Sequence, residues 1–209
     1  MTKGCPVPAY EIVGVVPVVR PNAFVHPTAV LIGDVIVEGE CYIGPSASLR
    51  GDFGRIVVGR GSNVQDGCVL HAFPGRDLTL EPESHVGHGA ILHGCTIRPR
   101  ALIGMNAVVM DGAVVGHDAL VAANSFVPAG THVEPRWLVA GSPIAPVREL
   151  DEETIAWKGN GLRVYQELAA RSLASLRPVS PATSVPVNRS RVSTTAEVAQ
   201  PLHEHRDDR

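Results

Sequence analysis

The sequence predicts an all-β solenoid, a parallel β-helix of hexapeptide repeats followed by a C-terminal α-helix. Aliphatic residues recur every six positions, small residues often follow four places later, and aromatic residues make up only 4% of the chain. A six-residue unit has the size of one short strand and a corner, so three units form one triangular coil. The aliphatic positions expected to point inward are Val25, Leu31, Val37, Ile43, Leu49, Val58, Val64, Leu70, Leu80, Val86, Leu92, Ile97, Ile103, Val109, Val115, Val121 and Val127.

The repeat defines a β-helix domain over residues 10–146, and its spacing breaks in three places. The first break adds three residues around Asp52, and the second adds four between Leu70 and Leu80. The third removes one residue after Leu92. The second break predicts a loop that leaves the coil. Irregular loops on a rigid scaffold are frequent places for functional sites.

After the last repeat, a passage rich in proline and glycine predicts that the chain leaves the coil. Residues 147–177 change to a helical period and predict an α-helix that packs on the β-helix. Asp151 is the expected N-cap, and Gly159 and Gly161 favour a division into two helices. Residues 178–209 are rich in Pro, Ser and Thr without periodicity, so we expect a disordered tail.

The composition of the chain argues against several classes of protein. The net charge of -3 gives no basic surface for phosphates, so no nucleic-acid partner is expected. No apolar run is long enough for a membrane span, and the N-terminal IVGVVPVV lacks the features of a signal peptide, so we expect a cytoplasmic protein. The four cysteines form no CxxC pair, and Cys41, Cys68 and Cys95 occupy positions for small buried residues.

Three histidines inside the repeat, His71, His88 and His93, are candidate metal ligands. Three protein ligands with one open position are typical of a catalytic zinc site. With the Leu49 unit as face one of the prism, Arg50, His71 and His93 each follow an inward aliphatic residue on that face. Alternation along a strand then places all three in one outward column on successive coils.

His88 falls on face three instead, two places after its aliphatic residue and above Asp66. In a closed trimer, face one of one subunit can meet face three of its neighbour, so each ion would be held by His71 and His93 of one chain and His88 of the next. Arg50 and Asp66 are then either an ion pair between subunits or catalytic groups, and Gln65 is a candidate to orient a bound water. The alternative is that these are ordinary surface histidines.

The segments SLRGDFGRIVV, GSNVQDGCVLH, GHGAILHGC, IGMNAVVMDGAVVG and VAGSPI resemble γ-class carbonic anhydrase-like hexapeptide proteins. Within that group the chain is similar to the phenylacetic-acid-degradation protein and its carnitine-operon relative. The resemblance spans about residues 10–177 and implies a left-handed β-helix, a homotrimer, and zinc (or iron or cobalt) at the subunit interface. It implies His71, His88 and His93 as ligands, and the family's arginine, aspartate, asparagine, glutamine and aspartate correspond to Arg50, Asp52, Asn63, Gln65 and Asp66.

Two departures from the family bear on the reaction. The glutamates that relay protons in well-studied γ-class anhydrases correspond here to Phe53 and Pro74, which argues against efficient CO2 hydration. The similarity to the degradation protein implies hydrolysis of acyl-CoA thioesters of the phenylacetyl type, including ring-hydroxylated forms, in phenylacetate catabolism. Phe53 and the inserted loop would offer an apolar wall to an aryl group.

We therefore predict a zinc-dependent thioester hydrolase. The ion lowers the pKa of its water so that hydroxide is available near neutral pH, and it polarises the carbonyl that the hydroxide attacks. Gln65 and Tyr165 are expected to position the nucleophile, with Arg50 and Asp66 as further candidates. The alternatives are a γ-class carbonic anhydrase, a CoA-dependent hexapeptide acyltransferase, and a trimeric scaffold without catalysis, because the fold alone does not decide the function.

Overall fold

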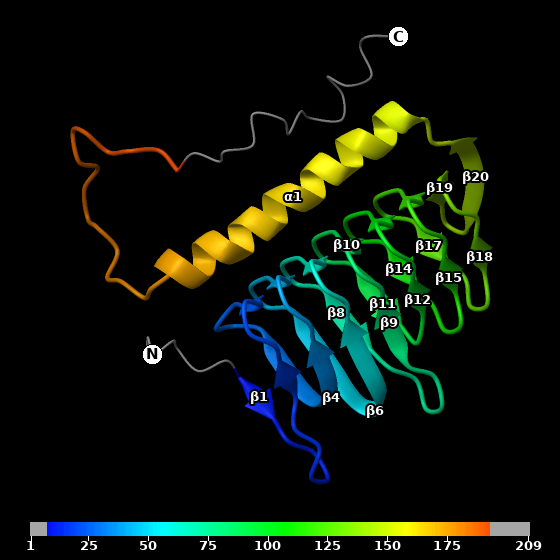
Figure 1. Cartoon of the computed structure of the whole chain (residues 1–209), viewed down its shortest axis with the longest axis horizontal. Helices are drawn as coiled ribbons and strands as arrows, with labels where there is room; N and C mark the ends of the chain where they lie inside the picture. Colours follow the sequence, from blue (N-terminus) through cyan, green and yellow to red (C-terminus); the bar gives the residue numbers. More distant parts are fainter. Residues whose placement is uncertain (1–7, 193–209) are drawn as a thin grey trace.

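The computed structural model describes residues 8–192 and contains a parallel β-helix with a long helix along its side (Figure 1). Faces one and two share a 12-stranded sheet, because β4 (Val30–Val37) and β6 (Ser48–Val58) pass from one face to the other. Face three is a separate eight-stranded sheet. The predicted parallel solenoid with a C-terminal helix is confirmed, while its left hand and its trimeric state stay predictions.

The remaining strands follow the three faces. Face one also holds β1 (Ala9–Tyr10), β8 (Val69–His71), β11 (Ile91–His93), β14 (Val108–Val109) and β17 (Phe126–Val127). Face two holds β2 (Val18–Val19), β9 (Leu78–Leu80), β12 (Thr96–Ile97), β15 (Val114–Val115) and β18 (His132–Val133). Face three holds β3 (Phe24–Val25), β5 (Tyr42–Ile43), β7 (Asn63–Val64), β10 (His85–Val86), β13 (Leu102–Ile103), β16 (Leu120–Val121), β19 (Trp137–Gly141) and β20 (Ile144–Glu149).

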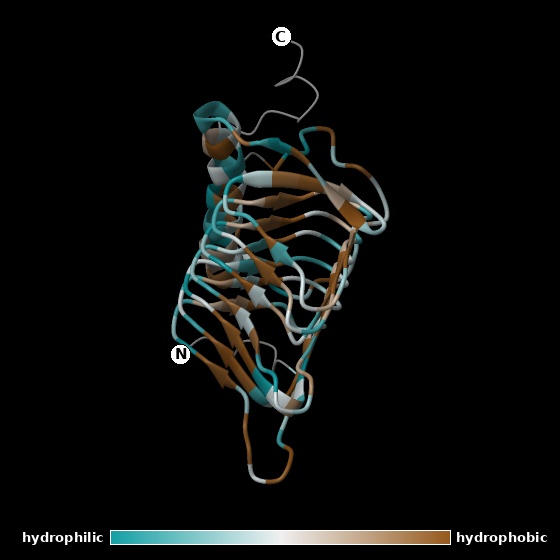
Figure 2. Ribbon diagram, turned by 90° about the vertical axis from the view of Figure 1, so that its right-hand side faces the viewer, coloured by the Kyte–Doolittle hydropathy of each residue, from teal (hydrophilic) through white to brown (hydrophobic). Residues whose placement is uncertain are grey.

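The aliphatic residues predicted to point inward form the core. Val25 is 7% exposed, and the other predicted inward aliphatic residues are completely buried. Mostly hydrophobic strands stack coil on coil along the prism (Figure 2). Burial of one such side chain is worth about 1.5–3 kcal/mol, so a long column of them holds a fold that has few aromatic residues. The small residues four places later are also buried, as the spacing predicted.

Glycine after the inward aliphatic residue is explained by the closeness of neighbouring coils. A Cβ atom at Gly104 would lie 2.5 Å from the backbone nitrogen of Ala123, and one at Gly116 would lie 2.5 Å from the nitrogen of Pro135. Real Cβ atoms do not approach this closely, so a side chain at either position would push the coils apart.

One expectation about the coil is wrong. The coil continues beyond Val127 for two further units, because β18 pairs with β15 and β19 pairs in parallel with β16. Val133 and Val139 keep the six-residue period and are 5% and 4% exposed, while Pro135 between them lies outside the strands. Asp52 and the residues inserted around it lengthen strand β6 rather than interrupting it. The second break does form a loop, closed by a bridge between Phe73 and Arg76.

The C-terminal helix, α1 (Glu152–Ser175), is continuous through Gly159 and Gly161, so the predicted division into two helices is wrong. The helix runs beside face three in Figure 1, and the buried side chains of Lys158 and Leu162, on either side of the two glycines, outweigh the low helix propensity of glycine. Asp151 is the N-cap as predicted, and its side chain accepts a hydrogen bond of 2.8 Å from the backbone nitrogen of Thr154. The helix begins at Glu152 and not at residue 147 as predicted, because residues up to Glu149 form β20 of the antiparallel β19–β20 hairpin.

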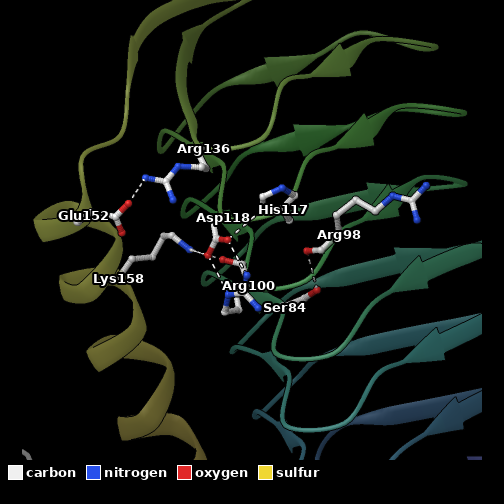
Figure 3. A network of polar contacts seen from close by, with 8 residues as sticks. All are labelled: Ser84, Arg98, Arg100, His117, Asp118, Arg136, Glu152 and Lys158. Carbon is white, nitrogen blue, oxygen red and sulfur yellow. Dashed lines mark hydrogen bonds and ion pairs between the residues drawn. The ribbon is translucent and has the colours of Figure 1, made fainter.

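A polar network fixes the N-terminal half of α1 to the coils (Figure 3). Lys158, on the inner side of the helix, donates to the carbonyl of Arg100 and forms an ion pair with Asp118. Arg136 pairs with Glu152 at 2.6 Å in the first turn of the helix. Lys158 is 4% exposed, and burial lowers its pKa to about 8, with the charge of Asp118 opposing that shift.

Other expectations concern the tail, the cysteines and the membrane. Residues 176–192 contain no helix or strand, and the rest of the predicted disordered tail, 193–209, lies outside the described residues, as does Cys5. Cys41, Cys68 and Cys95 are buried and free. Within residues 8–192, no helix is both long enough and apolar enough to cross a membrane.

Candidate metal centre

Strand pairing on face one brings His71 and His93 together. His71 ends β8 and His93 ends β11, and the register places Arg50, His71 and His93 in one column on successive coils, as the sequence predicted. His71 Nδ1 lies 3.0 Å from His93 Nε2. Their side chains are 11% and 27% exposed, so the pair is partly open to solvent.

The second ring nitrogen of each histidine contacts a carboxylate. Asp52 Oδ1 lies 2.9 Å from His71 Nε2, and Asp111 Oδ1 contacts His93 Nδ1. An ionised carboxylate only accepts hydrogen bonds, so these two ring nitrogens carry the hydrogens. In neutral rings, the facing nitrogens of His71 and His93 then both present lone pairs. Two facing lone pairs repel each other, and the arrangement therefore calls for a shared proton or a cation.

The donor set fits a divalent metal of the zinc class. Two imidazole nitrogens on one tetrahedral zinc lie about 3.3 Å apart, given zinc–nitrogen distances of about 2.05 Å. That separation is close to the one observed between His71 and His93. Metal-binding histidines also usually donate their second ring hydrogen to a carboxylate, as Asp52 and Asp111 allow here. The pair can thus supply two of the three predicted ligands.

Arg50 and Asp52 complete this side of the site. Arg50 Nη1 donates to Asp52 Oδ2 at 2.9 Å. Desolvation pushes the pKa of Asp52 upward, but the hydrogen bond from His71 and the charge of Arg50 outweigh it, and the net pKa is lowered. Asp52 therefore stays ionised and holds the orientation of His71. In this chain the partner of Arg50 is Asp52 and not Asp66; the ion pair expected between subunits stays a prediction.

Asp111 is a site residue that the sequence reasoning missed. It follows β14 at the corner of the next coil, where its carboxylate reaches back to His93. Gly94 lies against it, because a Cβ atom there would be 3.0 Å from Asp111 Oδ1. Counting units one coil beyond His93 would have placed Asp111 above Gly94, two positions after the inward Val109.

His88 belongs to a second cluster, on the corner after β10. Its Nδ1 lies 3.0 Å from Asp66 Oδ2, and its Nε2 lies 3.3 Å from the hydroxyl of Tyr165 on α1. Because Asp66 takes the hydrogen of Nδ1, Nε2 presents a lone pair. The side chain is 42% exposed. Among residues 8–192 no three His, Cys, Asp or Glu side chains of a single chain are placed to hold a metal, in keeping with the expected separation of His88 from the pair.

Gln65 lies beside this cluster and is held firmly. Its Nε2 donates to Asn63 Oδ1 at 3.0 Å and lies 2.7 Å from His85 Nε2. Both hydrogens of the amide are thereby used, which leaves its oxygen as the atom that can accept a hydrogen bond. Burial lowers the pKa of His85 to about 4, so its ring is neutral and accepts this hydrogen bond. The ring of Tyr165 packs edge-on against His85, with centroids 5.4 Å apart.

The predicted site residues thus form two clusters in one chain. Arg50, His71 and His93 lie on face one, whereas Gln65, Asp66, His88 and Tyr165 lie where face three meets α1. Two exposed rings flank the first cluster: Phe53 packs on His71 with centroids 5.2 Å apart, and Phe73 lies edge-on to His93 at 5.9 Å.

Comparison with known proteins agrees with this architecture. The family described as bacterial transferase hexapeptide (six repeats) matches residues 94–129. Carnitine operon protein CaiE of Salmonella agona is 49% identical over 189 residues, which cover 90% of this chain and 96% of the relative. CaiE of Escherichia coli K12 is also 49% identical with the same coverage.

Two solved structures are similar to this chain. A putative acetyltransferase from Bacillus cereus is 34% identical with a TM-score of 0.79, covering 80% of this chain and 98% of that one. A hexapeptide transferase family protein from Anaplasma phagocytophilum is 35% identical with a TM-score of 0.75, covering 78% and 97%. None of these four relatives is described as a hydrolase or a phenylacetate protein, so those expectations stay predictions. The chain itself belongs to the hexapeptide-repeat family that contains the carnitine operon protein CaiE.

Proposed function

We propose that this protein is a CoA-dependent acyltransferase that works at a divalent metal centre shared between neighbouring copies of the chain. The observation that carries the proposal is the pair of His71 and His93, whose facing nitrogens both present lone pairs 3.0 Å apart in front of two carboxylates. A shared proton or a cation would remove the repulsion between these lone pairs. The carboxylate behind each ring supports a cation, because metal-binding histidines usually have such a partner on their second nitrogen.

The third ligand is expected from a second copy. The side chain of His88 is 42% exposed on its corner, where Asp66 fixes Nδ1 and the lone pair of Nε2 faces the hydroxyl of Tyr165. A head-to-tail contact that closes into a ring would bring this corner to face one of the neighbour. Three identical sites then form per trimer, each with His71 and His93 from one copy and His88 from the next.

The metal would polarise the thioester carbonyl as a Lewis acid. Asp52 and Asp111 keep the ligand nitrogens of His71 and His93 free of hydrogen, and Arg50, with its side chain 45% exposed, adds a permanent positive charge beside them. The carbon–sulfur bond breaks, the acyl group passes to a hydroxyl or amino acceptor, and the acceptor's proton goes to the CoA thiolate. Burial raises the pKa of Tyr165 to about 12, so its hydroxyl keeps its proton and can donate near neutral pH.

The rings of Phe53 and Phe73 support an acyl substrate over CO2. Both are exposed, at 56% and 42%, and both pack against the histidine pair. They offer an apolar flank to an acyl group, and neither can relay a proton as CO2 hydration requires. The descriptions of the matched family and of the two similar structures favour transfer over hydrolysis. Thioester hydrolysis is the second candidate, because the same apolar flank and metal would serve water as the acceptor.

The test starts with metal analysis of the purified protein, followed by release of free thiol from acetyl-CoA and phenylacetyl-CoA. Each thioester is incubated with and without carnitine, whose hydroxyl is a suitable acceptor given the name of the CaiE relatives. Thiol release that needs the acceptor supports transfer, and release without it indicates hydrolysis. CO2 hydration without thiol release would indicate an anhydrase.

A matched pair of variants controls this test. His71→Ala should remove both metal and activity, whereas His132→Ala, an exposed histidine on face two, should change neither. A metal-free protein with an intact oligomer and no activity would be a scaffold and would overturn the proposal.

A further inference from the structure

A cavity of about 610 Å³ lies between α1 and the later coils of face three. The helix packs most closely on β3, β5 and β7, at the other end of the prism. There Tyr165 packs against Tyr42, with centroids 5.5 Å apart. The cavity opens beneath the helix over β13 and β16, whose residues Leu102 and Leu120 line it.

The floor of the cavity is one column of outward residues. Strand register continues this column from His85 to Leu102, Leu120 and Leu138 on successive coils. The leucines are half-buried, so their side chains face the cavity without being packed away. Trp157 and Gly161 form part of the roof, while Met105 and Val147 add to the apolar walls. A Cβ atom at Gly161 would have only His85 Cε1 within 4 Å, at 3.7 Å, so this position leaves room in the roof.

The polar groups in the wall are unevenly placed. Arg148 pairs in register with Leu138, and its Nη2 lies 3.3 Å from the hydroxyl of Thr154, which also lines the cavity. His85 is neutral and stands at the other end, three coils away. Among the described residues that line the cavity, none is an Asp or Glu. The cavity therefore has a cationic end and a long apolar body.

Lys158 also lines the cavity but is committed elsewhere. Its ammonium group donates to the carbonyl of Arg100 and pairs with Asp118. The charge of Arg148 is less fully neutralised. Its nearest carboxylate oxygen, Asp151 Oδ2, is 3.8 Å away, and the Asp151 side chain is 40% exposed. Arg148 is accordingly the cation best placed to receive an anionic group of a ligand.

We propose that this cavity binds an aliphatic carboxylate of medium chain length. The carboxylate lies at Arg148 and Thr154, and the chain runs over Leu138, Leu120 and Leu102 toward His85. Three coil steps of roughly 4.8 Å span roughly 14 Å, which matches an extended chain of about ten to twelve carbons. This site goes beyond the proposed function, because it requires neither the metal centre nor the acyl transfer.

Binding is tested on the full-length protein by calorimetric titration with butyrate, hexanoate, octanoate and decanoate. Affinity should rise about fourfold per methylene group, the increment for burying a CH2 group. Decanol, which has the same chain but no charge, should bind on the order of tenfold more weakly than decanoate. Arg148→Gln should remove this difference by weakening decanoate and leaving decanol unchanged.

Variants that fill the cavity should block binding. Leu120→Trp and Gly161→Leu each place a large side chain in it, and either should lower the affinity for decanoate at least tenfold. Gly159→Leu is the matched control, because Gly159 is outside the lining and a Cβ atom there meets nothing within 4 Å. This control should bind as the wild type does. Thermal unfolding of each variant shows whether the fold is intact.

Absence of binding, affinity that does not depend on chain length, or binding unaffected by both filling variants would each overturn the proposal. Binding of decanoyl-CoA without binding of decanoate would also overturn it, and would assign the cavity to the acyl-transfer substrate. Chain-length-dependent binding of the free acids by a protein with no transferase activity would retain this site and reject the proposed function.

Discussion

Lys158 Nζ lies 3.7 Å from Asp118 Oδ1, and the two side chains are only 3% and 6% exposed. Their other partners are unequal. Asp118 also accepts two hydrogen bonds from Arg100, at 2.9 and 2.7 Å, and contacts His117 at 3.0 Å. Lys158 has in addition the carbonyl of Arg100. The carboxylate is thus the centre of the network that holds α1 to the coils, and the lysine is at its edge.

This asymmetry predicts unequal effects of two substitutions. Asp118→Asn should lower the free energy of unfolding by about 3–5 kcal/mol, because it leaves the buried ammonium of Lys158 without a counter-charge. Lys158→Met should cost much less, since Asp118 keeps Arg100 and the methionine fills a similar volume. Urea unfolding of both variants measures the difference, and equal losses would show that the carboxylate is not the central group.

Lys158 should also make stability depend on alkaline pH. Burial lowers its pKa in the folded state from 10.5 to about 8, so the unfolded chain binds the proton more tightly. The contribution of this group is therefore greatest above pH 10.5 and falls as the pH drops toward 8, by about 3 kcal/mol at most. Relative to Lys158→Met, the wild type should gain stability between pH 8 and 10. A constant difference between the two proteins across this range would contradict the prediction.

The lowered pKa of His85 should make the stability of the protein depend on pH in the acidic range. Burial, assisted by the charges of Lys158 and His88, lowers its pKa from 6.5 to about 4. Its contribution to stability is complete above pH 6.5 and is lost as the pH falls toward 4, by at most about 3 kcal/mol. The wild type should therefore lose stability relative to His85→Gln over this range. His132→Gln, at an exposed position, is the control and should follow the wild type.

The fold was largely predictable because the six-residue period is strict wherever a side chain points inward. Counting that period also placed Arg50, His71 and His93 in one column and His88 apart from them, which strand register confirms. The prolines and glycines after Val127 were wrongly taken to end the coil, because in this fold such residues occupy its corners. Local propensity likewise failed at Gly159 and Gly161, because the buried side chains of Lys158 and Leu162 on either side keep the helix continuous.

Contacts between distant segments could not be read from the period. Lys158 is 58 residues from Arg100 in sequence, and only the path of α1 back along the prism brings the two together. Tyr165 was predicted to position the nucleophile, but its contact with His88 depends on the same path of α1. Counting the six-residue units could have placed Asp111 next to His93. However, many corners carry an acidic residue, and only the contact with His93 distinguishes this one.

Two glycines should respond to the same substitution in opposite ways. Gly104→Ala should destabilise the protein, because the new Cβ atom would lie 2.5 Å from the backbone nitrogen of Ala123 on the next coil. Gly159→Ala should stabilise it by up to about 1 kcal/mol, since alanine favours a helix and the added atom meets nothing within 4 Å. Thermal unfolding distinguishes the two, and a stable Gly104→Ala protein would show that the coils can move apart there.

His88→Ala and His93→Ala should each abolish metal binding, and co-refolding the two variants should restore it. A site shared between copies needs His71 and His93 from one chain and His88 from the next, so a His88→Ala chain followed by a His93→Ala chain holds one complete site. Random mixing in a trimer then restores roughly a quarter of the sites. Metal content per chain measures this fraction. A mixture of His71→Ala and His93→Ala is the control and should restore nothing, because both ligands must come from the same chain; recovery in the control, or none in the first mixture, would reject a shared centre.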